Sequence, residues 1–124
     1  MQTFRSLTDI ENAHLPPNLH RAVTQAVRTL LDIYGEDYDP EDGSFVVLID
    51  PSTTDAHGHE LLGRPWSQAL LEGVIYDSAT RCFLSCCLFN NEDGVTLIIP
   101  DEEWLDADFR AKLVAELNEA GGAP

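Results

Sequence analysis

The sequence predicts one α+β domain, spanning residues 1–124, in which an antiparallel sheet of about four to five strands packs against two helices. The first observation is a pair of apolar runs between Cys82 and Pro100, separated by a short polar segment. The second is helical spacing of apolar residues near both ends of the chain. We expect the N-terminal and C-terminal helices to form a single layer on one face of the sheet.

The segment from Cys82 to Pro100 is typical of a β-hairpin with a loop over Asn90 to Gly94. Nearly every residue of both runs is apolar, so these strands either have both faces covered or lie centrally in the sheet. The connections between the last three predicted strands are short, which favours antiparallel pairing.

The N-terminal third is predicted to be mainly helical. Residues 1–15 are a mixed lead-in that could hold a short helical turn capped by Ser6 or Thr8. The pair Pro16-Pro17 then ends one segment and starts a helix to Tyr34, which Gly35 closes. Its apolar positions recur at helical spacing, at Leu19, Val23, Ala26, Val27, Leu30, Leu31 and Tyr34.

The middle of the chain predicts short strands. Residues 44–50 form a buried strand that Asp50-Pro51 stops, and residues 73–76 form another, followed by a turn over 77–81. Periodicity does not distinguish a short helix from a bent edge strand over Trp66 to Glu72, so both alternatives stay open.

The last predicted element is a helix after Pro100. Asp101 and Asp106 are equally plausible as its N-cap, because a carboxylate can accept the first unpaired amide hydrogens. Phe109, Leu113 and Leu117 then share one helical face.

Charge is the outstanding global property. Twenty-two acidic residues against seven basic ones give a formal charge of −15. Such a surface repels nucleic acid and anionic lipid and attracts a basic protein surface. Solubility or adaptation to a salty cytoplasm is an alternative origin of the charge. No stretch reaches the roughly 18 apolar residues of a membrane span, and no export signal opens the chain, so we expect a cytoplasmic protein.

The acidic residues gather in the C-terminal third, where no lysine or arginine occurs between Leu88 and Phe109. If the hairpin loop and the last helix lie at opposite ends of one strand, the acids form two clusters about 20 Å apart. These predicted partner-binding acids are Glu92, Asp93, Asp101, Glu102, Glu103, Asp106 and Asp108.

Arg64 and Trp66 complete the predicted partner-binding set, because arginine and tryptophan are enriched at interface hot spots. The alternative is that Trp66 folds onto the core, with Pro65 shaping the turn before it.

The segment from Asp55 to Glu60 is the candidate metal site. His57 and His59, with the flanking carboxylates of Asp55 and Glu60, offer donors that zinc or nickel accepts. A polar loop that happens to hold two histidines is the alternative. The acidic loop at 36–43 fails as an EF-hand, because Asp42 stands where glycine is needed.

The remaining motifs give no support for catalysis, although an enzyme does not require one of them. Cys82, Cys86 and Cys87 lie inside a predicted strand and are expected to pack in the core. No phosphate-binding glycine loop and no serine nucleophile motif occurs, and we expect no cofactor.

We therefore expect a small non-enzymatic protein that binds a basic partner protein, as an inhibitor, immunity or anti-defence factor or a nucleic-acid mimic does. The alternative is a metal-binding protein or metal-dependent hydrolase that uses the His57/His59 loop. A third hypothesis is a structural subunit whose apolar strands pair across an interface.

Overall fold

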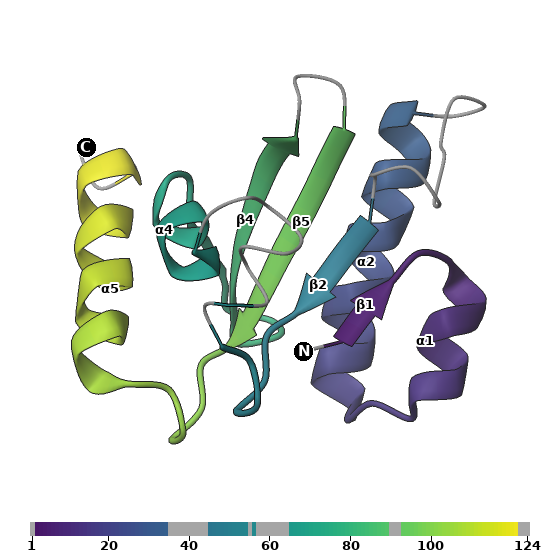
Figure 1. The fold of residues 1–124 in the computed structure, drawn as a ribbon, viewed down its shortest axis with the longest axis horizontal. Helices are drawn as coiled ribbons and strands as arrows, with labels where there is room; N and C mark the ends of the chain where they lie inside the picture. Colours follow the sequence, from purple (N-terminus) through teal and green to yellow (C-terminus); the bar gives the residue numbers. More distant parts are fainter. Residues whose placement is uncertain (1, 35–44, 55, 57–64, 90–92, 122–124) are drawn as a thin grey trace.

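The computed structural model describes residues 2–34, 45–54, 56, 65–89 and 93–121 (Figure 1). Within these ranges it has five strands: β1 (Gln2–Phe4), β2 (Phe45–Leu48), β3 (Ile75–Asp77), β4 (Cys82–Phe89) and β5 (Asp93–Pro100). The helices of the same ranges include α1 (Leu7–Ala13), α2 (Pro17–Tyr34), α4 (Trp66–Leu71) and α5 (Ala107–Gly121). The predicted α+β class is confirmed.

The sheet is mixed, whereas a purely antiparallel sheet was predicted. Its order is β1-β2-β5-β4-β3, and β2 pairs with β5 in parallel, from Phe45 opposite Val95 to Leu48 opposite Ile98. The other three pairings are antiparallel. Short loops constrain only strands that follow one another in the chain. The direction of β2 against β5 depends instead on the long segment between them, which local patterns do not show.

Helices cover both faces of the sheet, so the prediction of a single helical layer is wrong. On one face, α4 and α5 pack over a core that includes Val95, Leu97 and Ile99, and on the other, α1 and α2 pack over Val46 and Ile98. Figure 1 shows the two helix pairs on opposite sides of the strands. Successive side chains of β5 point to opposite faces and most are apolar, so each face needs its own cover.

The N-terminal lead-in contains a strand that the sequence did not predict. Strand β1 pairs with β2, and its Phe4 side chain is buried against the α1/α2 core. Three residues are too few for an alternating pattern to be visible. Helix α1 follows, and Ser6 is its N-cap, since the Ser6 hydroxyl accepts the Asp9 amide hydrogen at 3.3 Å.

The segment is helical from Trp66 to Leu71, with Glu72 as its C-cap, which resolves the alternatives left open by its pattern. The buried Ser85 hydroxyl of β4 donates to the Ala69 carbonyl of α4 at 3.3 Å, so this helix is tied to the sheet. The hairpin is confirmed, because β4 pairs with β5 from Cys82 opposite Pro100 to Phe89 opposite Asp93. Gly35 and residues 90–92 lie outside the described residues.

Helix α5 begins after Asp106, which settles the choice between two N-caps. The Asp106 carboxylate accepts the Phe109 amide hydrogen at 2.9 Å, which is the bond an N-cap makes three residues into a helix. Asp101 lies outside the helix, directly after β5.

Candidate functional site

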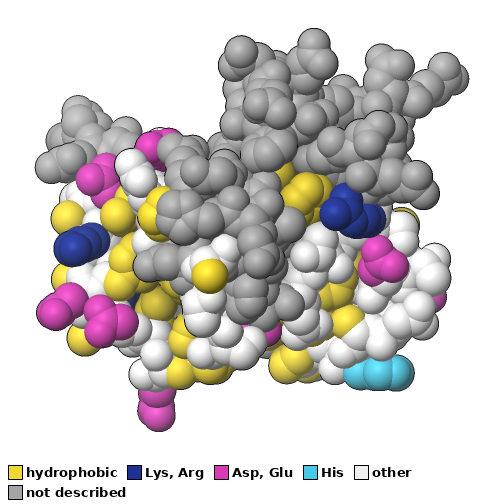
Figure 2. Space-filling view, in the orientation of Figure 1, with side chains coloured by type: hydrophobic (Ala, Val, Ile, Leu, Met, Phe, Trp, Pro, Cys, Tyr) yellow, Lys and Arg dark blue, Asp and Glu magenta, His cyan; other side chains and the backbone are white. Residues whose placement is uncertain are grey.

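Five acidic residues lie between the end of β5 and the first turn of α5, and we call them the acidic corner: Asp101, Glu102, Glu103, Asp106 and Asp108. Four of the five side chains are exposed, and Asp101 is half-buried. In Figure 2, acidic side chains gather at the lower left of the molecule, near α5 and below the strands.

Asp101 is the one member of the acidic corner that pairs with a cation in the described part of the chain. The Arg110 guanidinium donates to both carboxylate oxygens of Asp101, at 2.7 and 3.0 Å. This bidentate bond lowers the pKa of Asp101 below its ordinary value. The other four carboxylates therefore leave the corner strongly negative.

Trp104 stands among these acids and was missed by the sequence reasoning. Its indole is half-buried against the α4/α5 core, and its Nε1–H donates to the Glu102 carboxylate at 2.8 Å. This bond fixes an aromatic ring beside exposed carboxylates. The sequence signal that could have identified Trp104 as a candidate binding residue is its position inside an acidic segment between a predicted strand and a predicted helix.

The two predicted acidic clusters lie at opposite ends of β5 as far as the described backbone shows. Asp93 begins the strand and Asp101 follows its last residue. At about 3.3 Å per residue, the eight steps from Asp93 to Asp101 span about 26 Å, somewhat more than the roughly 20 Å expected. Glu92 lies outside the described residues, as does the side chain of Asp93. Among the predicted acids whose side chains the structure describes, all five belong to the acidic corner.

Trp66 is the first residue of α4 and lies far from the acidic corner in the sequence. Its ring meets Phe109 of α5 edge to face, with centroids 5.6 Å apart. Its indole nitrogen is buried without a hydrogen-bond partner among the described residues. Arg64 lies outside the described residues, and a partner-binding role for this pair stays a prediction.

The predicted metal ligands Asp55, His57, His59 and Glu60 all lie outside the described residues, so the metal hypothesis stays a prediction. Among the residues that the structure does describe, no group of three or more histidine, cysteine, aspartate or glutamate side chains could hold a metal ion.

Of the three cysteines, Cys82 is the one whose side chain is described. It is buried, and its thiol donates weakly to the Thr80 carbonyl at 3.4 Å. Burial raises the pKa of this thiol, so it stays protonated and unreactive at neutral pH. Cys82 therefore packs as a small apolar residue in the core under α2.

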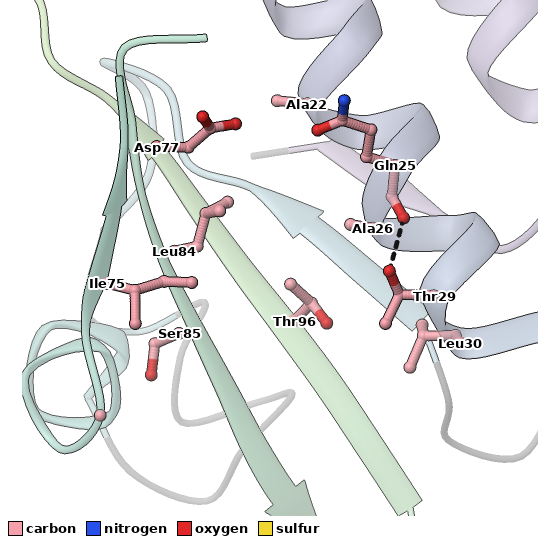
Figure 3. A pocket seen from close by; sticks show the side chains of 11 residues that line it. Ala22, Gln25, Ala26, Thr29, Leu30, Ile75, Asp77, Leu84, Ser85 and Thr96 are labelled. Carbon is pink, nitrogen blue, oxygen red and sulfur yellow. Dashed lines mark hydrogen bonds between the residues drawn. The ribbon is translucent and has the colours of Figure 1, made fainter. Parts of the chain in front are cut away.

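An apolar groove of about 440 Å³ lies on the α1/α2 side of the sheet. Helix α2 forms one wall, while β3, β4 and β5 contribute the floor and the other wall (Figure 3). The residues that line it are Ala22, Gln25, Ala26, Thr29, Leu30, Gly73, Ile75, Asp77, Leu84, Ser85 and Thr96. This groove is not visible in the sequence, because its walls come from segments about 50 residues apart.

A second hollow, of polar character, lies next to the groove, since its lining residue Thr80 donates a hydrogen bond to the groove residue Asp77 at 2.9 Å. It is lined by Asn18, Ala79, Thr80, Arg81, Asp101 and Glu102, so it reaches the acidic corner. The Asn18 side chain donates to the Thr80 carbonyl at 3.1 Å, and this bond links α2 to the turn between β3 and β4.

Comparison of the chain with protein-family models, with curated proteins and with solved structures found no match. Among the described helices, none combines the length and the apolar character that crossing a membrane requires.

Proposed function

We propose that this protein is a non-enzymatic cytoplasmic binding protein whose acidic corner occupies a basic surface of a partner protein. An inhibitor, immunity or anti-defence factor works in this way, and a nucleic-acid mimic is its extreme form. One observation carries the proposal. Trp104 is half-buried and donates a hydrogen bond to Glu102, and the exposed carboxylates beside it have no cationic partner in the described residues.

Electrostatics and packing have separate parts in this proposal. The chain carries a formal charge of −15, and a basic partner relieves the mutual repulsion of its carboxylates. Complementary charge speeds association in a salt-dependent way, whereas a tryptophan held in one orientation supplies contact area and affinity. The same charge opposes direct binding to nucleic acid.

The test is affinity capture from host lysate at low and at high salt. The diagnostic variant carries Glu102→Gln, Glu103→Gln and Asp108→Asn. It leaves Asp101 bonded to Arg110 and Asp106 as the N-cap of α5, so the fold is retained. A basic protein should be captured at low salt by the unmodified chain and lost with the variant.

The matched control removes the same three charges elsewhere, through Glu11→Gln, Asp32→Asn and Glu116→Gln on α1, α2 and α5. The control should retain the partner. An equal loss with both variants would mean that overall charge, and not the acidic corner, holds the partner.

A further inference from the structure

Among the described residues, the helical layer over the α1/α2 face leaves part of the sheet uncovered. Helix α2 packs on β2 and β5, and α1 packs on α2 and β1. On the opposite face, α4 packs directly on β4. The apolar groove lies beside α2 over β4 and β3, at the position where a next helix of this layer would sit. Neighbouring helices in a layer lie about 8–10 Å apart.

The walls of the groove suit an apolar helix face. The side chains of α2 at the groove are the small ones of Ala22 and Ala26, so the backbone of another helix can approach α2 closely. Ile75 and Leu84 project from the sheet toward α2 (Figure 3). The Ile75 side chain is 60% exposed, the largest exposure among the large apolar side chains of the described residues. Covering it would bury apolar surface that otherwise stays in water.

Charge indicates what kind of helix would fit. At one end, Asp77 lines the groove and accepts a hydrogen bond from Thr80, which lines the adjacent polar hollow. That hollow is lined by two acids, Asp101 and Glu102, and by one cation, Arg81. Along its α2 rim, Arg21 and Arg28 neighbour Gln25 at helical spacings of four and three residues. Cationic residues of an occupant therefore belong at the end that reaches Glu102 and not along α2.

We propose that the apolar groove binds one amphipathic helix of the basic partner, with an aliphatic face against Ile75 and Leu84 and its lysine or arginine residues toward Glu102. This inference rests on the proposed function and adds the form of the partner's segment. A second copy of this chain is a poor occupant, because each copy brings a charge of −15. An added strand would pair with the edge of β3 and leave the groove unfilled.

The test uses an 18-residue peptide of leucine and lysine, arranged so that all leucines share one helical face. A second peptide has the same composition in an order without such a face. Each is titrated into the full ¹⁵N-labelled chain while backbone amide shifts are recorded. The amphipathic peptide should shift amides of residues 22–30 in α2 and of Ile75 and Leu84, and the second peptide should not.

Two matched variants locate the contact. Ile75→Asp places a charge at the groove and should weaken binding of the amphipathic peptide about tenfold or more. Leu31→Asp makes the same change at a side chain that is 36% exposed but does not line the groove, and it should change binding less than about twofold.

The outcomes separate this inference from the proposed function. Shifts confined to residues 101–110 would overturn the groove as a docking site and leave the acidic corner as the binding surface. Equal binding of both peptides at the groove would overturn the requirement for a helix. An absence of shifts throughout the chain would contradict both proposals. Dimerisation in high salt that shifts the groove amides would assign the groove to a second copy and overturn the proposal.

Discussion

The two faces of the sheet are built from the same strands yet differ in how completely they are covered. On β5, Val95, Leu97 and Ile99 point to α4 and α5, and each is at most 1% exposed. The alternate residues point to α2, where Ile98 is buried and Thr96 lines the groove. Burial of a strand residue therefore depends on which helix lies above it, and not on the strand pattern alone.

The same comparison separates two kinds of surface. The covered face continues into α5 and the acidic corner, where Trp104 is held by Glu102 beside the core. The partly covered face presents the apolar groove. The polar hollow lies between them: Asp101 and Glu102 of the corner line it, and its Thr80 is bonded to Asp77 of the groove. The proposed partner contacts both surfaces. Charge at the corner would govern the rate of association, while the groove would contribute affinity.

The largest expected effect comes from shortening a leucine on each face. Leu97→Ala opens a cavity in the closed core and should lower the free energy of unfolding by about 3 kcal/mol. Leu84→Ala removes a half-buried side chain at the groove, where water already has access, and should cost about 1 kcal/mol. Urea unfolding followed by circular dichroism measures both. Equal losses would contradict the difference in coverage.

A smaller effect compares the helix caps on the two faces. Asp106→Ala removes the 2.9 Å cap of α5 and should lower the free energy of unfolding by about 1 kcal/mol. Ser6→Ala removes the longer 3.3 Å cap of α1 and should cost about 0.5 kcal/mol. Asp106→Asn is the control, since asparagine caps equally well, and thermal unfolding ranks the three. A large loss with Asp106→Asn would show that charge, and not the cap bond, is what matters there.

The smallest effect tests the ion pair that joins α5 to the end of β5. Its bond to Arg110 lowers the pKa of Asp101 in the folded chain. The stability it contributes is thus complete above the unfolded pKa of about 4 and is lost as pH falls through the folded value. Arg110→Gln should lower the urea midpoint slightly at pH 7, and the difference from the unmodified chain should shrink toward pH 3. A difference that grows in acid would contradict this linkage.

Local patterns in the sequence were enough for several elements. The spacing of Leu19, Val23 and Leu30 behind Pro16-Pro17 predicted α2, and the two apolar runs predicted the β4–β5 hairpin. These predictions hold because periodicity and turn residues act between near neighbours in the chain. The apolar character of β5 on both faces also indicated cover on each side, although a single helical layer was predicted.

Only the tertiary structure decided the features that depend on distant segments. The parallel pairing of β2 with β5 and the addition of β1 both depend on contacts that no local window contains. The N-cap bond of Asp106 is local, but the sequence offered Asp101 as an equal candidate until the structure showed Asp101 paired with Arg110. The acidity of the corner and the position of Trp104 in it were visible in the sequence, but the packing of its indole against the α4/α5 core was not. The groove likewise exists because α2 covers Cys82 at the start of β4 but leaves Leu84 half-buried, which depends on how layers pack and not on any one segment's pattern.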